Sequence, residues 1–308
     1  MARASARTKP LAPRPGWRFD IDYLSDDPGT TFRRRIWERF SHAGVASDVV
    51  VPWYDGLHIR LFLGNDLSKC LYVAGEFEPN ELSFLARWLE PGMVVLDAGA
   101  NDGLYTILAA NRVRAGGRVV AIEPSVRERR RLEANVRLNS LEDLVTVLPY
   151  ALYDRSGTGK MAIAELGHEG QNTVGQTVSN PKVGAEREEQ VALRTLDEVA
   201  VELHLSRLDF LKLDVEGCEA RVLRGGAQAL ARFRPLIQLE AEPDALAVQG
   251  SSVQDIEETL ASLNYVIYEF SDETGELERT ASAADGGNFV AAPAELDLFG
   301  QLPEEVRS

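Results

Sequence analysis

The stretch Val94–Ala110, VVLDAGANDGLYTILAA, decides the fold of this chain. It starts as an apolar strand, turns through Gly99 and Gly103, and continues with apolar residues at helical spacing. A glycine-rich turn from strand to helix lets the backbone approach a ligand closely, and several nucleotide-like molecules use such turns. The stretch therefore predicts a ligand-binding βα unit. It leaves the ligand open between NAD, ATP, S-adenosylmethionine and none.

Strands and helices alternate on both sides of this unit. Continuous apolar runs predict buried strands, and amphipathic stretches between them predict helices, a pattern typical of a largely parallel sheet covered on both faces. The helix over 124–139 opens with Ser125 and Glu128 at capping-box spacing. A long loop without a clear period is expected over 164–190. The expected strands cover 93–98, 118–123, 144–152, 208–215, 234–241, 265–270 and 287–293, with a further helix over 218–233.

The N-terminal part of the chain differs from this alternating pattern. Residues 1–18 are basic and contain no acidic residue, which predicts a disordered tail. A helix over 31–40 and two short strands separated at Asp55-Gly56 predict a small helix-and-hairpin element. We therefore divide the chain into the tail at 1–18, this element at 19–75 and an α/β domain at 76–300.

Composition limits the classes of partner. The 308 residues carry a formal net charge of -15, which disfavours nucleic acid and anionic membranes as partners. The arginine-rich run 127–131 is accordingly interpreted as a solvated helix face. Cys70 and Cys218 are too few for a disulfide framework, and no apolar run approaches the ~20 residues of a membrane span. We expect a cytoplasmic protein with reduced thiols.

The glycine turn itself discriminates between ligands. A dinucleotide site needs G-x-G-x-x-G, whereas this chain has Asp97, Gly99 and Gly103 as D-x-G-x-x-x-G. An acid at Asp97 is a poor neighbour for a pyrophosphate and a good one for the amino group of an amino-acid moiety. This favours S-adenosylmethionine over NAD. The structural alternative is a βα turn in which Asp97 only caps the helix.

Three more acids end predicted strands at the same sheet edge. Glu123 is placed to bind the two hydroxyls of an adenosine ribose, although NAD enzymes use an acid in the same way and a helix N-terminus would favour it too. Asp214 ends a buried strand, where a charge usually faces a ligand pocket. With Glu240 from the neighbouring strand it could share a proton or hold Mg²⁺, but no bound metal is expected.

At this point the sequence resembles a known family. The segments FEPNELSFLARWLEPGMVVLDAGANDGLYTILAA, EPSVRERRRLEANVRLN, TLDEV, LDFLKLDVEGCEARVLRGG and RPLIQLE, within about 76–240, are similar to the FkbM-type methyltransferases. The resemblance implies S-adenosylmethionine as cofactor and O-methylation of natural products or glycans. It also implies a Rossmann-like, doubly wound, mostly parallel seven-stranded sheet with a reversed last strand.

The resemblance also implies a set of site residues. Residues that match the family's motifs would surround the methionine part, the ribose and the adenine of the cofactor. The expected cofactor-binding residues are Glu78, Asp97, Gly99, Ala100, Asn101, Gly103, Glu123, Pro124, Ser125, Ala151 and Asp214. Asp102 departs from the family, which more often has an apolar residue there.

The sequence leaves the reaction partly open. Asp214 is the first candidate for the base or orienting acceptor, and His168 in the long loop is the second. The expected partner is a small-molecule or glycan hydroxyl, and a homodimer is left open. Two alternatives remain, a NAD-dependent oxidoreductase and a non-catalytic S-adenosylmethionine-binding module.

Overall fold

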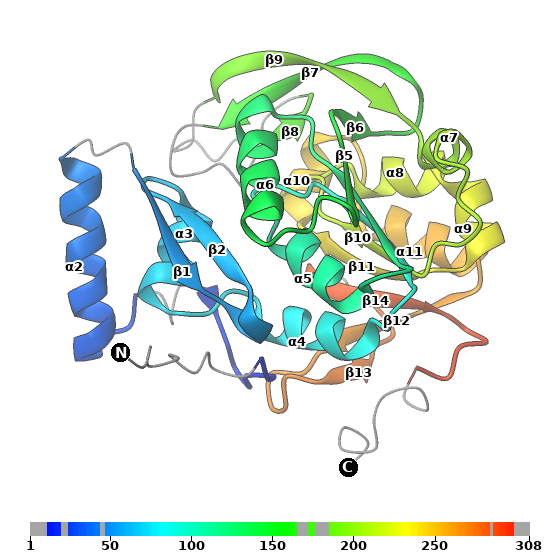
Figure 1. Ribbon diagram of the computed structural model, residues 1–308. Helices are drawn as coiled ribbons and strands as arrows, with labels where there is room; N and C mark the ends of the chain where they lie inside the picture. The colour runs from blue at the N-terminus through cyan, green and yellow to red at the C-terminus, as the bar shows by residue number, and fades with distance from the viewer. Residues whose placement is uncertain are drawn as a thin grey trace.

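An eight-stranded sheet forms the centre of the computed structural model, which describes residues 11–19, 24–43, 47–164, 172–175, 185–283 and 286–298. Its order is β13-β12-β14-β11-β10-β3-β4-β5 (Figure 1). The strands from β11 to β5 run parallel, whereas β14 is antiparallel to both of its neighbours. The strands are β3 Val94–Ala98, β4 Arg118–Ile122, β5 Val145–Leu148, β10 Phe210–Leu213, β11 Leu236–Ala241, β12 Tyr265–Phe270, β13 Leu277–Arg279 and β14 Gly287–Pro293. The doubly wound sheet with a reversed last strand is confirmed, and β13 is an eighth strand that the sequence pattern did not predict.

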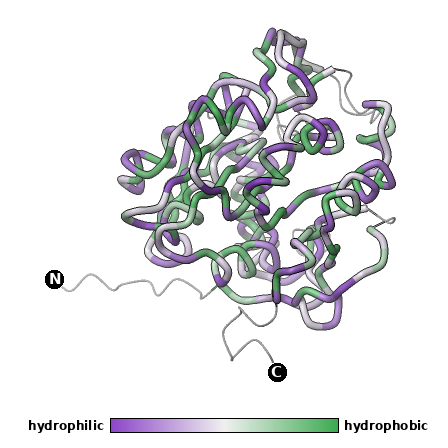
Figure 2. The backbone as a smooth tube through the Cα atoms, turned by 90° about the vertical axis from the view of Figure 1, so that its right-hand side faces the viewer, coloured by the Kyte–Doolittle hydropathy of each residue, from purple (hydrophilic) through white to green (hydrophobic). Residues whose placement is uncertain are grey.

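Helices cover both faces of this sheet. Alternate strand residues point to opposite faces and pack in two different apolar clusters. Val95 and Phe210 pack in the cluster that contains α4, α5 and α6, whereas Leu96 and Leu211 pack in the cluster of α7 to α11. Figure 2 shows apolar (green) segments of the chain crossing the middle of the molecule, where these clusters lie. The helices are α2 Pro28–His42, α3 Asp66–Val73, α4 Pro79–Trp88, α5 Leu104–Val113, α6 Val126–Leu138, α7 Leu196–Glu202, α8 Glu219–Gly225, α9 Ala227–Phe233, α10 Pro243–Val248 and α11 Val253–Ser262.

A second, four-stranded sheet lies where a single strand and a long loop were predicted. Its order is β6-β9-β7-β8, with β7 and β9 forming the long curved pair in Figure 1. The predicted strand 144–152 is broken at Pro149, which has no N–H to donate to a ladder, so β5 and β6 join different sheets. The predicted loop 164–190 is partly strand, because β8 and the start of β9 fall inside it. The strands of this sheet are β6 Tyr150–Leu152, β7 Gly157–Ala164, β8 Thr173–Val174 and β9 Ala185–Arg194.

The predicted helix 218–233 is also divided, into α8 and α9. The break falls at Gly225 and Gly226. A Cβ atom on Gly225 would lie 2.2 Å from the backbone oxygen of Tyr153. The glycine is therefore needed where α8 meets the end of β6, an approach that helical periodicity does not reveal.

The predicted N-terminal hairpin is present as β1 Asp48–Pro52 and β2 His58–Phe62, joined through the short 3-10 turn Tyr54–Gly56. The outer edge of β2 is closed by side chains of α6. The backbone N–H of Arg60 donates to Asn135 Oδ1 and that of His58 donates to Asn139 Oδ1, each at 2.8 Å. Asn135 also donates from Nδ2 to the backbone oxygen of Asp102 at 2.8 Å. The hairpin is thereby tied to both α6 and the turn after β3.

Part of the predicted disordered tail makes defined contacts. The backbone N–H of Arg14 donates to Asn80 Oδ1 at 2.6 Å, and its guanidinium pairs with Glu76 at 3.0 Å. The Trp17 ring stands edge-on to Phe77, with centroids 6.2 Å apart. These contacts join Arg14 and Trp17 to partners that are far away in sequence. Within the described ranges, no helix has the length and apolar composition of a membrane span.

Candidate active site

A cavity of about 360 Å³ opens at the carboxyl ends of the central strands. Its walls come from the ends of β3, β4, β10 and β11, from the four-stranded sheet, and from N-terminal residues including Phe19 and Leu67. Most of the predicted site residues meet here. Those lining the cavity are Glu78, Asp97, Gly99, Ala100, Asn101, Glu123, Pro124, Ala151, Asp214 and Glu240. Gly103 and Ser125 are not among the lining residues, and His168 lies outside the described residues.

The turn after β3 forms the floor of the cavity, and its two glycines have different roles. Gly99 has a φ of +80°, and a Cβ atom there would lie 1.7 Å from the backbone oxygen of Asp214. Gly103 has a φ of +90°, and a Cβ atom there would lie 2.5 Å from Leu132 Cδ1. Gly99 therefore brings β3 and β10 together at the cavity, whereas Gly103 allows α5 to pack against α6.

Asp97 already has a partner within the protein. It is 2% exposed, and its Oδ2 accepts a hydrogen bond from Thr106 Oγ1 at 2.5 Å. Burial raises the pKa of Asp97 to about 6, although the Thr106 hydrogen bond and the Lys212 charge oppose this shift. Thr106 thus orients the carboxylate on the cavity wall. That Asp97 binds a ligand amino group stays a prediction.

Glu123 keeps hydrogen-bonding capacity on both carboxylate oxygens. Its Oε1 accepts from the backbone N–H of Ser125 at 2.8 Å, and its Oε2 accepts from that of Asn101 at 2.9 Å. Burial raises the pKa of Glu123 to about 8, and the nearby Glu128 carboxylate adds to the shift. A carboxylate offers about four lone-pair sites, so both oxygens can still accept from hydroxyl groups.

The segment that follows Glu123 differs from two expectations. Ser125 begins α6, but its hydroxyl hydrogen-bonds the Glu128 carboxylate instead of a backbone N–H, so the predicted capping box is absent. The arginine run is not simply a solvated face. Arg129 donates to the backbone oxygens of Glu123 and Pro124, at 3.0 and 2.9 Å. Arg131 pairs with Asp102 at 3.7 Å, so the acid that departs from the family pattern has a charge partner on α6.

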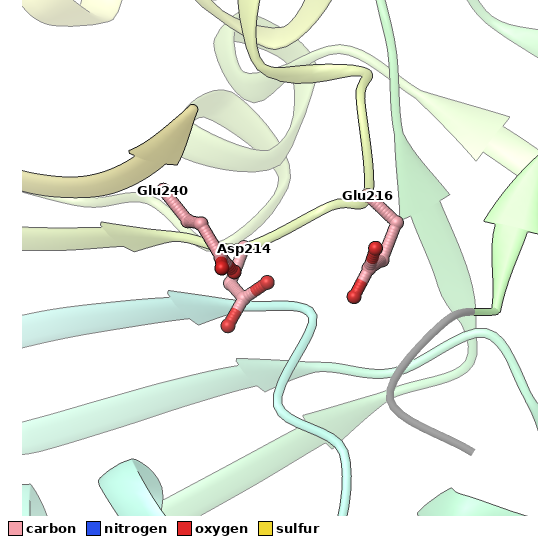
Figure 3. Close-up of side chains that lie close together, drawn as sticks. All are labelled: Asp214, Glu216 and Glu240. Atoms are coloured by element: carbon pink, nitrogen blue, oxygen red, sulfur yellow. The ribbon is translucent and has the colours of Figure 1, made fainter. Parts of the chain in front are cut away.

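Three carboxylates gather where β10 and β11 end. Asp214, Glu216 and Glu240 each offer an oxygen, and these oxygens all lie within 4.8 Å of one another. Figure 3 shows the Asp214 and Glu240 carboxylates side by side, with Glu216 reaching toward the same space from the following loop. The Asp214 charge, followed by burial, raises the pKa of Glu240 well above its usual range. Burial, followed by the Asp214 charge, does the same for Glu216.

Lys212 is a functional candidate that the sequence reasoning missed. It is 2% exposed, lines the cavity, and donates from Nζ to Asp214 Oδ2 at 3.2 Å. Burial alone would lower the pKa of Lys212, but the carboxylates of Asp214, Glu78 and Glu240 raise it above its usual value. The available signal was the pattern LDFLKLD, in which a charged residue takes an inward position of an otherwise apolar strand.

Glu78 also lines the cavity, in a left-handed conformation with a φ of +42°. Its Oε2 accepts from the Tyr105 hydroxyl at 2.6 Å, and its Oε1 accepts from Asn288 Nδ2 at 3.1 Å. Gln238 in turn donates from Nε2 to the Tyr105 oxygen at 3.0 Å. Burial raises the pKa of Glu78, whereas the Lys212 charge lowers it. These contacts hold a carboxylate at the cavity through α5, β11 and β14.

The sheet order, the reversed β14 and the cavity at the strand ends define a Rossmann-like fold of the class I methyltransferase type. The model of the methyltransferase FkbM domain matches residues 97–267. The chain therefore belongs to the FkbM methyltransferase family.

Individual similar proteins are known from bacteria and fungi. The AMB antimetabolite synthetase AmbE of Pseudomonas aeruginosa is 34% identical over 286 residues, an alignment that covers 79% of this chain and 13% of AmbE. The methyltransferase sdnD of Sordaria araneosa is 29% identical, over 42% of this chain and 59% of sdnD. The chain thus spans less than two thirds of each relative.

Two solved structures also overlap with this chain. An FkbM methyltransferase from Methylobacillus flagellatus has a TM-score of 0.43 at 14% identity, covering 73% of this chain and 52% of that one. An O-methyltransferase from Bacillus cereus in complex with SAH has a TM-score of 0.41 at 13% identity, covering 89% and 94%.

Proposed function

We propose that this chain binds S-adenosylmethionine in the cavity and methylates a hydroxyl group of a natural product, sugar or glycan. The observation that carries the proposal is the arrangement of one continuous cavity from Glu123, past the Gly99 turn, to Asp214. Its volume of about 360 Å³ falls in the range of ligand pockets, roughly 300–1,000 Å³. The name of one relative, an antimetabolite synthetase, supports an acceptor of the natural-product type, and that of the other, a methyltransferase, supports methyl transfer.

The residues of the cavity fit the three parts of this cofactor. Glu123 has free acceptor capacity for the ribose hydroxyls, and the apolar side chains of Ala151, Leu152 and Met161 offer a surface for adenine. Asn101 has a buried Oδ1 without a hydrogen-bond partner among the described residues, at the turn assigned to the methionine part. An orphaned acceptor of this kind gains a partner when a donor group of a ligand arrives.

Methyl transfer then depends on where the chain holds the acceptor. S-adenosylmethionine supplies a methyl group on a sulfonium, so the acceptor oxygen forms the new C–O bond while the C–S bond breaks and leaves S-adenosylhomocysteine. Asp214 would accept a hydrogen bond from the acceptor hydroxyl, orient its lone pair, and take its proton. We place the acceptor between this carboxylate and the N-terminal element 19–75, which contributes Phe19, Asp66 and Leu67 to the cavity lining.

Calorimetry and turnover test this proposal against its alternatives. We expect S-adenosylmethionine and S-adenosylhomocysteine to bind, and NADH not to bind, because the dinucleotide glycine pattern is absent. Release of S-adenosylhomocysteine in a panel of hydroxylated sugars and natural products then separates an enzyme from a non-catalytic binding module. Binding of NADH instead, or no binding of either ligand, would overturn the proposal.

The raised pKa of Glu123 predicts how affinity depends on pH. Ribose hydroxyls donate to the ionised carboxylate, so the bound state lowers a pKa that is about 8 in the free protein, and binding releases a proton near neutral pH. The test ligand is 5′-methylthioadenosine, which has the ribose but no amino-acid part. As the pH is raised toward 8, its affinity should increase by up to about tenfold per pH unit. Calorimetry in two buffers of different ionisation heat measures the released proton. Glu123→Gln should bind more weakly without this dependence, and an unchanged pH profile in that variant would refute the assignment.

A further inference from the structure

The charge balance of the three-carboxylate cluster points to Lys212. Among the described residues lining the cavity, Lys212 is the one with a cationic side chain; no arginine or histidine is present there. Its charge opposes the raised pKa of Glu216 and Glu240 in the cluster, of Asp97 beside it on β3, and of Glu78. A single buried ammonium therefore serves as the common counter-charge of the site.

The position of this ammonium is fixed by the strand that carries it. Lys212 and Asp214 are two residues apart on the chain, and Lys212 lies beside Gln238 in the register of β10 and β11. Its Nζ lies 3.2 Å from Asp214 Oδ2 and 5.0 Å from the centroid of the Tyr105 ring. An electron-rich ring face and a carboxylate on two sides hold the ammonium in place.

We propose that Lys212 is the resident cation of this carboxylate cluster, balancing its charge as a divalent metal would and positioning Asp214 for the acceptor. A divalent cation shared by the three carboxylates would lie close to an ammonium that already binds Asp214, and the two positive charges would repel each other. Methyl transfer in this chain accordingly needs no metal. This inference rests on the proposed function for its catalytic part only.

The first test measures metal binding at the three-carboxylate cluster and does not depend on enzymatic turnover. Tb³⁺ luminescence and Mg²⁺ calorimetry are measured on the wild-type protein, on Lys212→Met, and on Lys160→Met as a control. Lys160 is an exposed lysine of β7 that pairs with Glu188 at 2.8 Å, outside the cavity. We expect binding to Lys212→Met alone, because that variant leaves three carboxylates without their counter-charge. Equal binding to wild type and Lys212→Met would overturn the proposal, whether or not the protein is a methyltransferase.

The second test measures turnover, with an acceptor identified in the panel of hydroxylated sugars and natural products. Wild-type activity should be the same in EDTA and in added Mg²⁺. Lys212→Met should lose about 100-fold in kcat while its affinity for S-adenosylhomocysteine stays within about threefold, as for loss of an electrostatic group near the reacting atoms. Mg²⁺ should restore part of that loss, and Lys212→Arg should retain more activity than the methionine variant. Inactivation of the wild type by EDTA, with recovery in Mg²⁺, would show that a metal takes this role.

The proposal can be tested even if a Lys212 variant fails to fold. Binding of S-adenosylhomocysteine reports whether each variant keeps its cavity, and the EDTA comparison uses the wild-type protein alone. If the wild type binds no S-adenosylhomocysteine, the proposed function fails, whereas the resident-cation proposal is still decided by the metal titrations.

Discussion

Replacing Gly99 by alanine is expected to abolish cofactor binding and to lower the free energy of unfolding by at least about 3 kcal/mol. The added Cβ atom would lie 1.7 Å from the backbone oxygen of Asp214. The backbone there cannot move away freely, since the N–H of Asp214 donates to the oxygen of Ala98 at 3.0 Å. Relief of the clash must separate β3 from β10, which opens the floor of the cavity.

Gly116→Ala is the matched control for this variant. Gly116 also has a positive φ, of +93°, but nothing lies within 4 Å of its added Cβ atom. It therefore suffers the backbone penalty alone, about 1 kcal/mol, and keeps the affinity for S-adenosylhomocysteine. Urea unfolding and calorimetry compare the two. Equal losses in both variants would show that the contact with Asp214 has no special cost.

Replacing Asp214 by asparagine is expected to lower turnover by about 10²- to 10⁴-fold, as for loss of a general base. The substitution keeps the shape of the side chain and removes the charge that accepts the proton. The backbone contact with Gly99 is unaffected, and Lys212 keeps the carboxylates of Glu78 and Glu240 as counter-charges. Affinity for S-adenosylhomocysteine should therefore change little.

Steady-state kinetics with calorimetry on the same preparation checks this result. Asp143→Asn is the control, because Asp143 is an exposed acid outside the cavity. We expect its kinetics to match those of the wild type. Turnover of Asp214→Asn within about threefold of the wild type would remove Asp214 from the reaction and leave the neighbouring carboxylates to be tested in turn.

The central sheet could be predicted because its strands are buried on both faces. Apolar runs such as 94–96 of β3 and 119–122 of β4 are typical of strands in the middle of a covered sheet. The second sheet could not be predicted in this way, since β7 exposes its first residues and only its second half, 161–164, is apolar and buried. Pro149, inside the predicted strand 144–152, was the one local sign that the chain leaves the central sheet there.

The part of the candidate site that could be predicted consists of residues at the carboxyl ends of strands. Glu123, Asp214 and Glu240 share one sheet edge because parallel strands present their carboxyl ends together. Lys212 was missed because its role depends on three carboxylates from other segments of the chain, those of Glu78, Asp97 and Glu240, as well as on Asp214. The hydrogen bond from Thr106 to Asp97 could not be predicted either, since it depends on how α5 is oriented relative to β3.

Asn135 of α6 and Asn139, which caps the end of that helix, have a consequence for how the chain behaves in concentrated solution. A two-stranded hairpin normally leaves open edges that can recruit a strand from another molecule. Asn135 and Asn139 occupy the N–H groups of Arg60 and His58, so a helix closes the outer edge of β2 as a third strand would. Amide hydrogens at these two positions should exchange slowly with solvent although no strand covers them. The same two side chains remove that edge as a template for aggregation.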